Sequence, residues 1–160
     1  MRRLDLYLQF ERPLEPREVD AYREAIRRRA EREPLQYITG EVQFRELTLA
    51  VDPRVLIPRP ETEVLVGEVL AGVGEAGGGP VLDVGTGSGA IVLSLLREGP
   101  FDRGVATDAS SEALEVAAAN AERHGLGDRL ELRAGSLWEP IGEGEEFRVI
   151  VSNPPYVAAG

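Results

Sequence analysis

The sequence predicts an α/β fold built on a parallel β-sheet. Between residues 80 and 152, short apolar runs typical of buried strands alternate with longer stretches whose apolar residues recur at helical spacing. A glycine-rich segment follows the first of these strands directly and leads into a helix. This alternation indicates right-handed strand–helix–strand units, in which consecutive strands lie parallel in one sheet.

The composition limits what kind of protein this is. The 160 residues are 42% hydrophobic, which is enough for one core and a small appendage. Neither a membrane-spanning apolar run nor a signal-like N-terminus stands out, so we expect a cytoplasmic protein without membrane contact. Cysteine is absent and His124 is the only histidine, so disulfides are excluded and no metal site is expected.

The net charge of −10 is unevenly distributed. Residues 1–33 are nearly neutral, with 9 arginines and 8 acidic residues, whereas the rest of the chain carries the acidic excess. Such an acidic body lacks the basic surface that sequence-independent binding of nucleic acid requires. We therefore expect no direct nucleic-acid partner.

Residues 1–33 are expected to form a helical N-terminal region. Apolar residues recur at helical spacing over residues 16–33, among them Val19, Tyr22 and Ile26. The arginine triplet in this stretch is interpreted as a solvated helix face rather than a docking patch, because neighbouring glutamates balance its charge.

Residues 34–58 are expected to form a β-hairpin linker, because Tyr37-Ile38 and the apolar residues after them make two β-rich runs. The linker ends in IPRPETE, whose prolines stiffen the entry into a helix over residues 62–73. Thr62 or a neighbouring polar residue is expected to cap that helix. Residues 59–160 then form the α/β domain.

The elements of this domain follow a glycine-rich loop over residues 74–80. Strands and helices alternate from there to the end of the chain. We expect strands over 81–84, 104–107, 130–133 and 148–152, and helices over 91–97 and 111–124.

The strongest chemical motif is VLDVGTGSGAI, in which a strand carrying Asp83 turns into a helix through Gly85, Thr86, Gly87, Ser88 and Gly89. Glycines let a backbone approach a ligand in conformations that a Cβ forbids. The third glycine comes too early for the G-x-G-x-x-G of dinucleotide folds, and Asp83 suits an ammonium group better than a pyrophosphate. We therefore predict that this loop binds a cofactor with a cationic group.

Asp108 ends the next strand, 23 residues after Gly85. This spacing is typical of an acid that accepts hydrogen bonds from both hydroxyls of a ribose. A ribose and an ammonium group together describe a nucleoside that carries an amino acid, which indicates S-adenosylmethionine. For Asp108 alone, a strand-end residue that caps the following helix is the alternative.

A second chemical motif, Asn153-Pro154-Pro155-Tyr156, follows the last apolar strand. An amide or exocyclic amino nitrogen is a weak nucleophile, so catalysis has to hold its NH₂ group in line with an activated methyl. The Asn153 side-chain oxygen and the Pro154 carbonyl supply two acceptors, Pro155 stiffens the corner, and Tyr156 can stack on a planar amide or base. A plain turn explains the prolines but leaves Asn153 and Tyr156 without a role.

The stretches PLQYITGE, IPRPETE, LDVGTGSGAI and VSNPPYV together resemble the HemK/PrmC family, protein-(glutamine-N5) methyltransferases that act on peptide-chain release factors. The resemblance covers about residues 4–157 and implies a Rossmann-like class I S-adenosylmethionine-dependent methyltransferase fold. It implies that the cofactor lies across residues 85–89, with Asp83 near its amino group and Asp108 on its ribose. The corner, with Asn153 also bordering the cofactor, would bind the glutamine of the release factor's Gly-Gly-Gln loop, and residues 1–33 would help to hold the release factor.

The sequence departs from the family pattern at two places. Ser136 and Leu137 stand where the family has an acidic and often an aromatic residue in contact with adenine, so we expect weaker cofactor binding. The family's fold also adds three strands beyond the corner. We therefore expect this chain to be a truncated form that turns over poorly.

Two other functions remain open. An enzyme that methylates amino nitrogens of DNA or RNA shares the Asn-Pro-Pro-Tyr motif, although it would need a basic groove or a target-reading domain. A non-catalytic fragment that only binds the cofactor is favoured by Ser136 and by the short chain.

Overall fold

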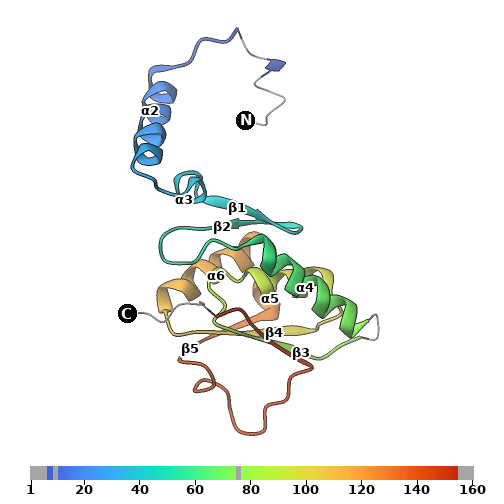
Figure 1. Cartoon of the computed structure of the whole chain (residues 1–160). Coiled ribbons are helices and arrows are strands. Elements are labelled where there is room, and N and C mark those ends of the chain that lie inside the picture. The colour runs from blue at the N-terminus through green and yellow to red at the C-terminus, as the bar shows by residue number, and fades with distance from the viewer. Residues whose placement is uncertain (1–6, 9–10, 75–76, 155–160) are drawn as a thin grey trace.

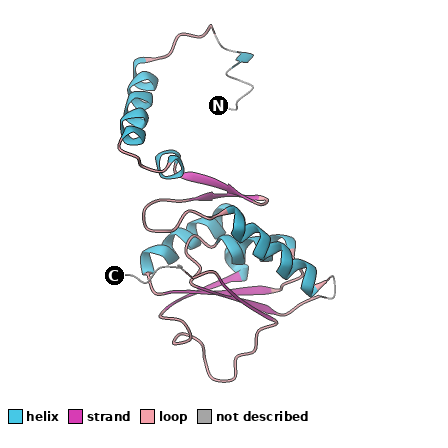
Figure 2. Cartoon of the chain, in the orientation of Figure 1, coloured by secondary structure: helices cyan, strands magenta, loops and turns pink. Residues whose placement is uncertain are grey.

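The structure, a computed structural model, describes residues 7–8, 11–74 and 77–154. An α/β body contains a four-stranded parallel sheet, and a helical arm stands off from it on the N-terminal side (Figure 1). Helices cover one face of the sheet, and a long loop crosses the other (Figure 2). The predicted α/β class with a parallel sheet is confirmed.

The strands of the sheet run in the order β5-β4-β3-β6, and every neighbouring pair is parallel. The strand order reverses between β3 and β6, and ligands of such sheets bind at the carboxyl ends of the strands beside this point. Strand register aligns the ends of all four strands, so the residues that follow them meet at one edge. The strands are β3 (Pro80–Val84), β4 (Arg103–Asp108), β5 (Leu130–Ala134) and β6 (Val149–Ser152).

Three helices cover one face of the sheet: α4 (Pro60–Val73), α5 (Ala90–Glu98) and α6 (Ser111–Arg123) (Figure 1). The helix α5 is the most deeply embedded, because it packs against β3, β4 and α4. Its first seven residues are all buried. No helix in the described part of the chain is long and apolar enough to cross a membrane.

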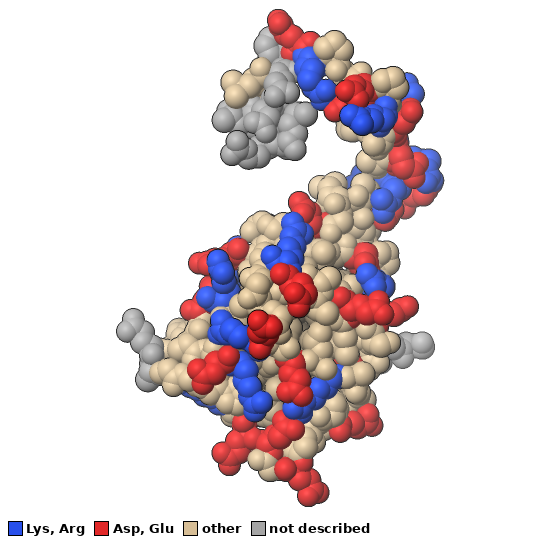
Figure 3. All heavy atoms as spheres, turned by 180° about the vertical axis from the view of Figure 1, so that it is seen from behind, with Lys and Arg blue, Asp and Glu red and all other residues tan. Residues whose placement is uncertain are grey.

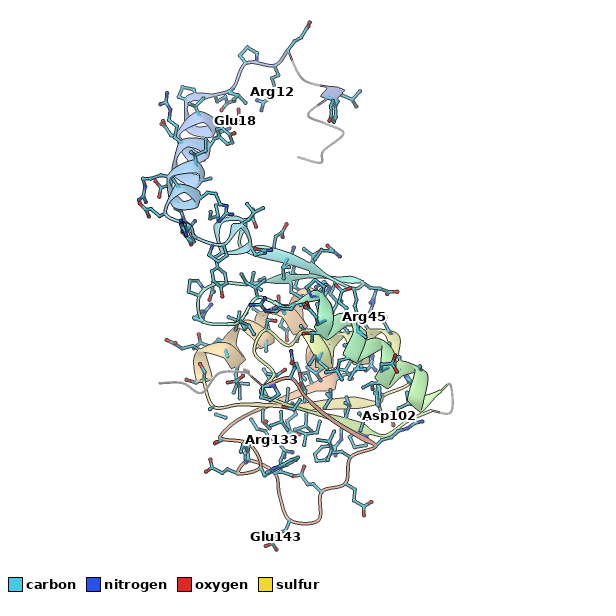
Figure 4. The ribbon with its side chains drawn as sticks, viewed as in Figure 1. Arg12, Glu18, Arg45, Asp102, Arg133 and Glu143 are labelled. Atoms are coloured by element: carbon cyan, nitrogen blue, oxygen red, sulfur yellow. The ribbon has the colours of Figure 1, made fainter. Side chains whose placement is uncertain are left out.

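The loop over residues 135–148 covers the opposite face of the sheet. Ile141 and Phe147 of this loop pack against buried apolar residues of β3 and β4. Arg133, near the end of β5, donates to the Glu145 carboxylate at 2.8 Å and to a backbone carbonyl of the loop at 3.1 Å. Figure 4 shows Arg133 on the side of the sheet where this loop lies. These contacts hold the loop in place, including the end that reaches the carboxyl edge of the sheet.

The predicted hairpin is formed by β1 (Glu41–Phe44) and β2 (Leu47–Ala50). Phe44, Leu47 and Leu49 are buried and belong to the main core. The hairpin therefore packs onto the body instead of only connecting two parts of the chain. Whether the chain divides into domains at residues 33 and 58 stays a prediction.

Arg45, in the turn of the hairpin, joins it to two helices. Its Nε donates to Oε1 of Glu98 in α5 at 2.9 Å, and its Nη1 donates to the carbonyl of Glu63 in α4 at 3.1 Å. Figure 4 shows Arg45 between the hairpin and α4. The guanidinium thus ties the linker to the helical layer of the body.

A short helix, α3 (Leu35–Thr39), precedes the hairpin. The prediction that Tyr37 and Ile38 lie in a β-rich run is therefore wrong. Gly40 ends the helix at φ +77°, a conformation that glycine adopts without strain. The Tyr37 hydroxyl donates to the carbonyl of Val55 at 2.7 Å, so a tertiary contact outweighs the β propensity of these residues.

The N-terminal arm contains the predicted helix α2 (Pro16–Ala30), none of whose residues is buried. A capping box between Glu15 and Glu18 fixes its first turn. Along its surface, Arg27 pairs with Glu24 and Glu31, each at 2.6 Å. Local interactions of this kind hold the helix where a core does not.

Candidate functional site

A cavity of about 480 Å³ opens at the carboxyl edge of the sheet, beside the point where the strand order reverses. This volume is typical of sites for small molecules. Loops that follow all four strands contribute to its wall, together with the linker and the start of α4. The lining residues are 54–59, 62, 84–88, 90–91, 107–110, 113, 135–137 and 152–154.

The glycine loop forms the cavity wall next to β3. Gly85, Gly87 and Gly89 all have positive φ, at 76°, 55° and 82°. Among the described residues, no other side chain or distant backbone lies within 4 Å of where a Cβ on Gly85 or Gly87 would stand, so these two positions are strained for other residues but not crowded by this part of the chain. The loop therefore presents bare backbone to the cavity.

Most N–H groups of this loop are used within the chain. The carbonyl of Thr107 accepts from Gly85 at 2.8 Å and from Thr86 at 2.9 Å. The Asp108 carboxylate accepts from Gly87 at 2.9 Å. Since a pyrophosphate site offers free N–H groups to the ligand, this pairing argues against a dinucleotide loop.

Asp83 lies behind the glycine loop and is fully buried. Its Oδ2 accepts from the Thr86 hydroxyl at 2.8 Å and from the N–H of Val92 at 3.3 Å, whereas Oδ1 has no partner among the described residues. Burial raises the pKa of Asp83 to about 6, and its two hydrogen bonds oppose that rise. Of the described residues, Asp83 is not one that lines the cavity, so its contact with a cofactor amino group stays a prediction.

Asp108 lines the cavity at the end of β4. Its Oδ1 accepts from the N–H of Ser110 and its Oδ2 from the N–H of Gly87, both at 2.9 Å. Each carboxylate oxygen can accept a second hydrogen bond, so Oδ1 and Oδ2 of Asp108 can still accept from the two hydroxyls of a diol. The cap of α6 is Ser110, whose hydroxyl accepts from Ala113 at 3.2 Å, so Asp108 is not needed for that role.

Ser136 and Leu137 line the cavity on the β5 side. Leu137 has φ +48° and is 64% exposed. The N–H of Ser136 donates to the Glu139 carboxylate at 3.0 Å, which brings an acidic group beside the position where the family has one. Contact of these residues with adenine stays a prediction.

Asn153 and Pro154 line the cavity directly after β6. The Ser152 hydroxyl donates to the carbonyl of Val84 at 2.7 Å, and Nδ2 of Asn153 donates to Oγ1 of Thr62 at 2.9 Å. The prediction that Thr62 or a neighbouring polar residue caps α4 is wrong, because the helix begins at Pro60 and Arg59 at its N-cap makes no side-chain cap bond. The predicted substrate-binding residues Pro155 and Tyr156 lie outside the described residues.

Asn120 is a buried polar residue that no sequence motif indicated. From α6 its Nδ2 donates to the carbonyls of Ser88 at 2.9 Å and Ala50 at 3.0 Å, and its Oδ1 accepts from the N–H of Ala50 at 2.7 Å. It thus joins the hairpin to the glycine loop. In the sequence, only its place on the inner face of a helix indicated that Asn120 would be buried. An alanine at that place would give the same indication without any hydrogen bond.

Comparisons with known proteins agree with this geometry. The methyltransferase small domain family matches residues 62–160, and the PrmC N-terminal domain matches residues 1–40. The chain belongs to the methyltransferase small domain family. The predicted resemblance to the HemK/PrmC family is confirmed by the match of both parts.

A release factor glutamine methyltransferase of Geobacter sulfurreducens is 47% identical over 155 residues, which cover 97% of this chain and 53% of that protein. The chain spans about half the length of the curated relatives it matches.

Two solved structures share the fold. A putative S-adenosylmethionine-dependent methyltransferase from Methanococcus maripaludis has a TM-score of 0.50 at 26% identity, over 56% of this chain and 40% of that chain. The ribosomal protein L11 methylase of Lactobacillus delbrueckii subsp. bulgaricus has a TM-score of 0.55 at 22% identity, over 72% and 66%. The class I methyltransferase fold that the resemblance implied is confirmed.

Proposed function

We propose that this chain binds S-adenosylmethionine and forms part of an enzyme that methylates a glutamine side-chain nitrogen of peptide-chain release factors, in their Gly-Gly-Gln loop. One observation carries the proposal: the glycine loop, Asp108 and the Asn153-Pro154 corner open into the same cavity. The name of the Geobacter relative supports the choice of substrate. The release factor as partner and the cytoplasm as location belong to this proposal.

The residues around the cavity fit the cofactor. The Asp108 carboxylate suits the two hydroxyls of a ribose. Oδ1 of Asp83, buried and without a partner among the described residues, is an acceptor that a nearby ammonium group would satisfy directly or through water. Ser136 and Leu137 border the part of the cavity left for the base.

S-adenosylmethionine supplies, when bound, a methyl group on a sulfonium that is already activated for transfer. Oδ1 of Asn153 and the carbonyl of Pro154 accept the two N–H bonds of the glutamine amide and turn its lone pair toward the methyl. The amide nitrogen that takes the methyl would carry a positive charge and would then release one proton to solvent. The corner therefore acts by orientation, without a strong base.

The charge distribution favours a protein substrate over DNA or RNA. The chain has a net charge of −10. On the face shown in Figure 3, acidic and basic side chains are interleaved and form no basic stripe. A groove that follows a nucleic-acid backbone needs clustered positive charge.

Methyl transfer from radiolabelled S-adenosylmethionine tests the proposal. The purified protein is incubated with a release factor, with the same factor carrying Gln→Ala in its Gly-Gly-Gln loop, or with duplex DNA. We expect label in the intact release factor alone. Label in DNA, or equal label in the Gln→Ala factor, would refute the proposed substrate.

The role of the corner is tested separately with Asn153→Ala. Because Asn153 is proposed to orient the acceptor amide, transfer should be lost while the cofactor Kd, measured by calorimetry, stays within a few-fold. A comparable loss of both would show that Asn153 mainly supports the cofactor site.

A further inference from the structure

The Asn153 side chain is connected to a residue of the distant stretch IPRPETE. Its Nδ2 donates to Oγ1 of Thr62 at 2.9 Å, across 91 positions of the chain. Both side chains line the same cavity, and Thr62 is only 7% exposed. The bond therefore lies in the wall of the site and is partly shielded from water.

We infer that Thr62 is a positioning residue that holds the Asn153 amide, in the orientation it has in the structure, for methyl transfer. This inference rests on the proposed function, since it assigns a task to Asn153 in that reaction. With Nδ2 turned to Thr62, Oδ1 of Asn153 is directed away from Thr62 and serves as the acceptor. In the reversed orientation, the NH₂ group of Asn153 would face the NH₂ group of the substrate, and two donors cannot pair.

Thr62 is suited to this task because its own position is fixed. Pro60 begins α4 with its restricted φ, and the N–H of Thr62 donates to the carbonyl of Arg59 at 2.9 Å. One turn later, Val66 is fully buried in the core. The hydroxyl thus projects from a turn that cannot shift easily, which is what a support for a binding group requires.

The corner is also held from the sheet side. Ser152 pairs with Val84 in the β3–β6 register, and its hydroxyl donates to the Val84 carbonyl at 2.7 Å. The backbone before Asn153 is therefore placed by β3, and the side-chain amide by α4. Loss of Thr62 Oγ1 should leave the first anchor intact and remove the hydrogen bond that joins the Asn153 amide to α4.

Two substitutions separate the hydroxyl from the shape of the side chain. Thr62→Val keeps the branched shape and removes Oγ1, whereas Thr62→Ser keeps the hydroxyl and removes a methyl. We expect kcat for the release factor to fall about 10- to 100-fold in Thr62→Val and to recover in Thr62→Ser. The cofactor Kd should change less than about threefold in both variants, because Thr62 is placed on the acceptor side.

Ser94→Ala is the matched control. Ser94 is a fully buried residue whose hydroxyl has no hydrogen-bond partner among the described residues, and it does not line the cavity. Removing it tests whether loss of any buried hydroxyl slows transfer. We expect kcat of Ser94→Ala within about twofold of the wild type.

A second measurement does not depend on activity. In ¹⁵N-labelled protein, the side-chain NH₂ of Asn153, assigned by its loss in Asn153→Ala, reports the bond to Thr62. We expect slow hydrogen exchange of one of its protons in the wild type and in Ser94→Ala, and fast exchange in Thr62→Val.

The two measurements distinguish the inference from the proposed function. Unchanged exchange in a folded Thr62→Val, or kcat equal to that of the wild type, would overturn the role of Thr62. A wild type that transfers no methyl to the release factor but shows the expected exchange pattern would refute the proposed substrate and leave the orientation of Asn153 by Thr62 supported. Equal losses in Thr62→Val and Thr62→Ser would also overturn the inference, because the hydroxyl would then not matter.

Discussion

The helices α2 and α5 were both predicted from apolar residues at helical spacing, but they lie in opposite environments. Every residue of α2 is at least partly exposed, and Ile26 on its apolar side is 51% exposed. In α5, seven consecutive residues are buried and Leu93 has no exposed surface. Periodicity therefore identifies a helix without telling how much of the molecule packs around it.

The two helices are consequently stabilised by different forces. The core around α5 removes apolar surface from water, which is the largest favourable contribution to folding. The arm relies on a capping box and on ion pairs between exposed side chains, each of which contributes little. Substitutions in the two regions should therefore change the free energy of unfolding by different amounts. For carboxylates, the pH dependence of that change should also have opposite signs.

The largest difference is expected from truncating one apolar side chain in each helix. Leu93→Ala should lower the free energy of unfolding by about 3 to 5 kcal/mol, because it leaves a cavity in a packed core. Ile26→Ala should change it by less than about 0.5 kcal/mol. Urea unfolding followed by circular dichroism measures both, and similar losses would mean that α2 packs against a partner in solution.

Carboxylates of the two regions should respond to pH in opposite directions. The folded pKa of Asp83, about 6, lies above its ordinary 3.8, so folding favours its protonated form. Its ionisation should therefore lower the free energy of unfolding as pH rises from about 4 to 6, by about 3 kcal/mol. Asp83→Asn lacks this contribution. The free energy of unfolding of the variant, relative to that of the wild type, should therefore rise as pH increases over that range.

Glu24 in the arm provides the contrast. Its hydrogen bond with Arg27 lowers its pKa, so its stabilising contribution is present above the ordinary pKa of a glutamate and lost as pH falls below it. Urea unfolding of Glu24→Gln at the same pH values should show the opposite trend and a much smaller effect. A flat difference curve for Asp83→Asn would contradict the raised pKa.

Asn120 tests whether the hairpin depends on the body. Asn120→Leu keeps the number and branching of the side-chain heavy atoms but leaves the N–H and carbonyl of Ala50 and the carbonyl of Ser88 without this partner, so we expect a loss of about 2 kcal/mol. Thr48→Val, which removes an exposed hydrogen bond to Gln43 in the same hairpin, should change stability far less. Thermal unfolding of the two variants compares them, and equal losses would argue against a special role for Asn120.

The smallest effect is expected for Arg27→Gln in α2. Its two ion pairs with glutamates are exposed, so solvent and salt screen them. We expect no resolvable shift in Tm at physiological ionic strength. A clear loss of Tm would show that the arm is more than a helix held by local contacts.

Much of the fold and part of the site could be predicted from local sequence. The alternation of strands and helices follows from periods of hydrophobicity that each segment carries within itself. The glycine loop, Asp108 and the Asn153-Pro154 corner could be found because their residue types are chemically unusual at the ends of strands. Their meeting at one edge followed from parallel strands, which the register now shows.

What only the tertiary structure decided lies in contacts between distant segments. Thr62 looked like a helix cap, and the hydrogen bond to Asn153 could not be foreseen from either stretch alone. Tyr37 and Ile38 favour a strand by local propensity, but the bond from Tyr37 to Val55 and the terminating Gly40 make the segment helical. The physical reason is the same in both cases. The partner of a side chain depends on which elements pack together, and the sequence around that side chain does not determine this packing.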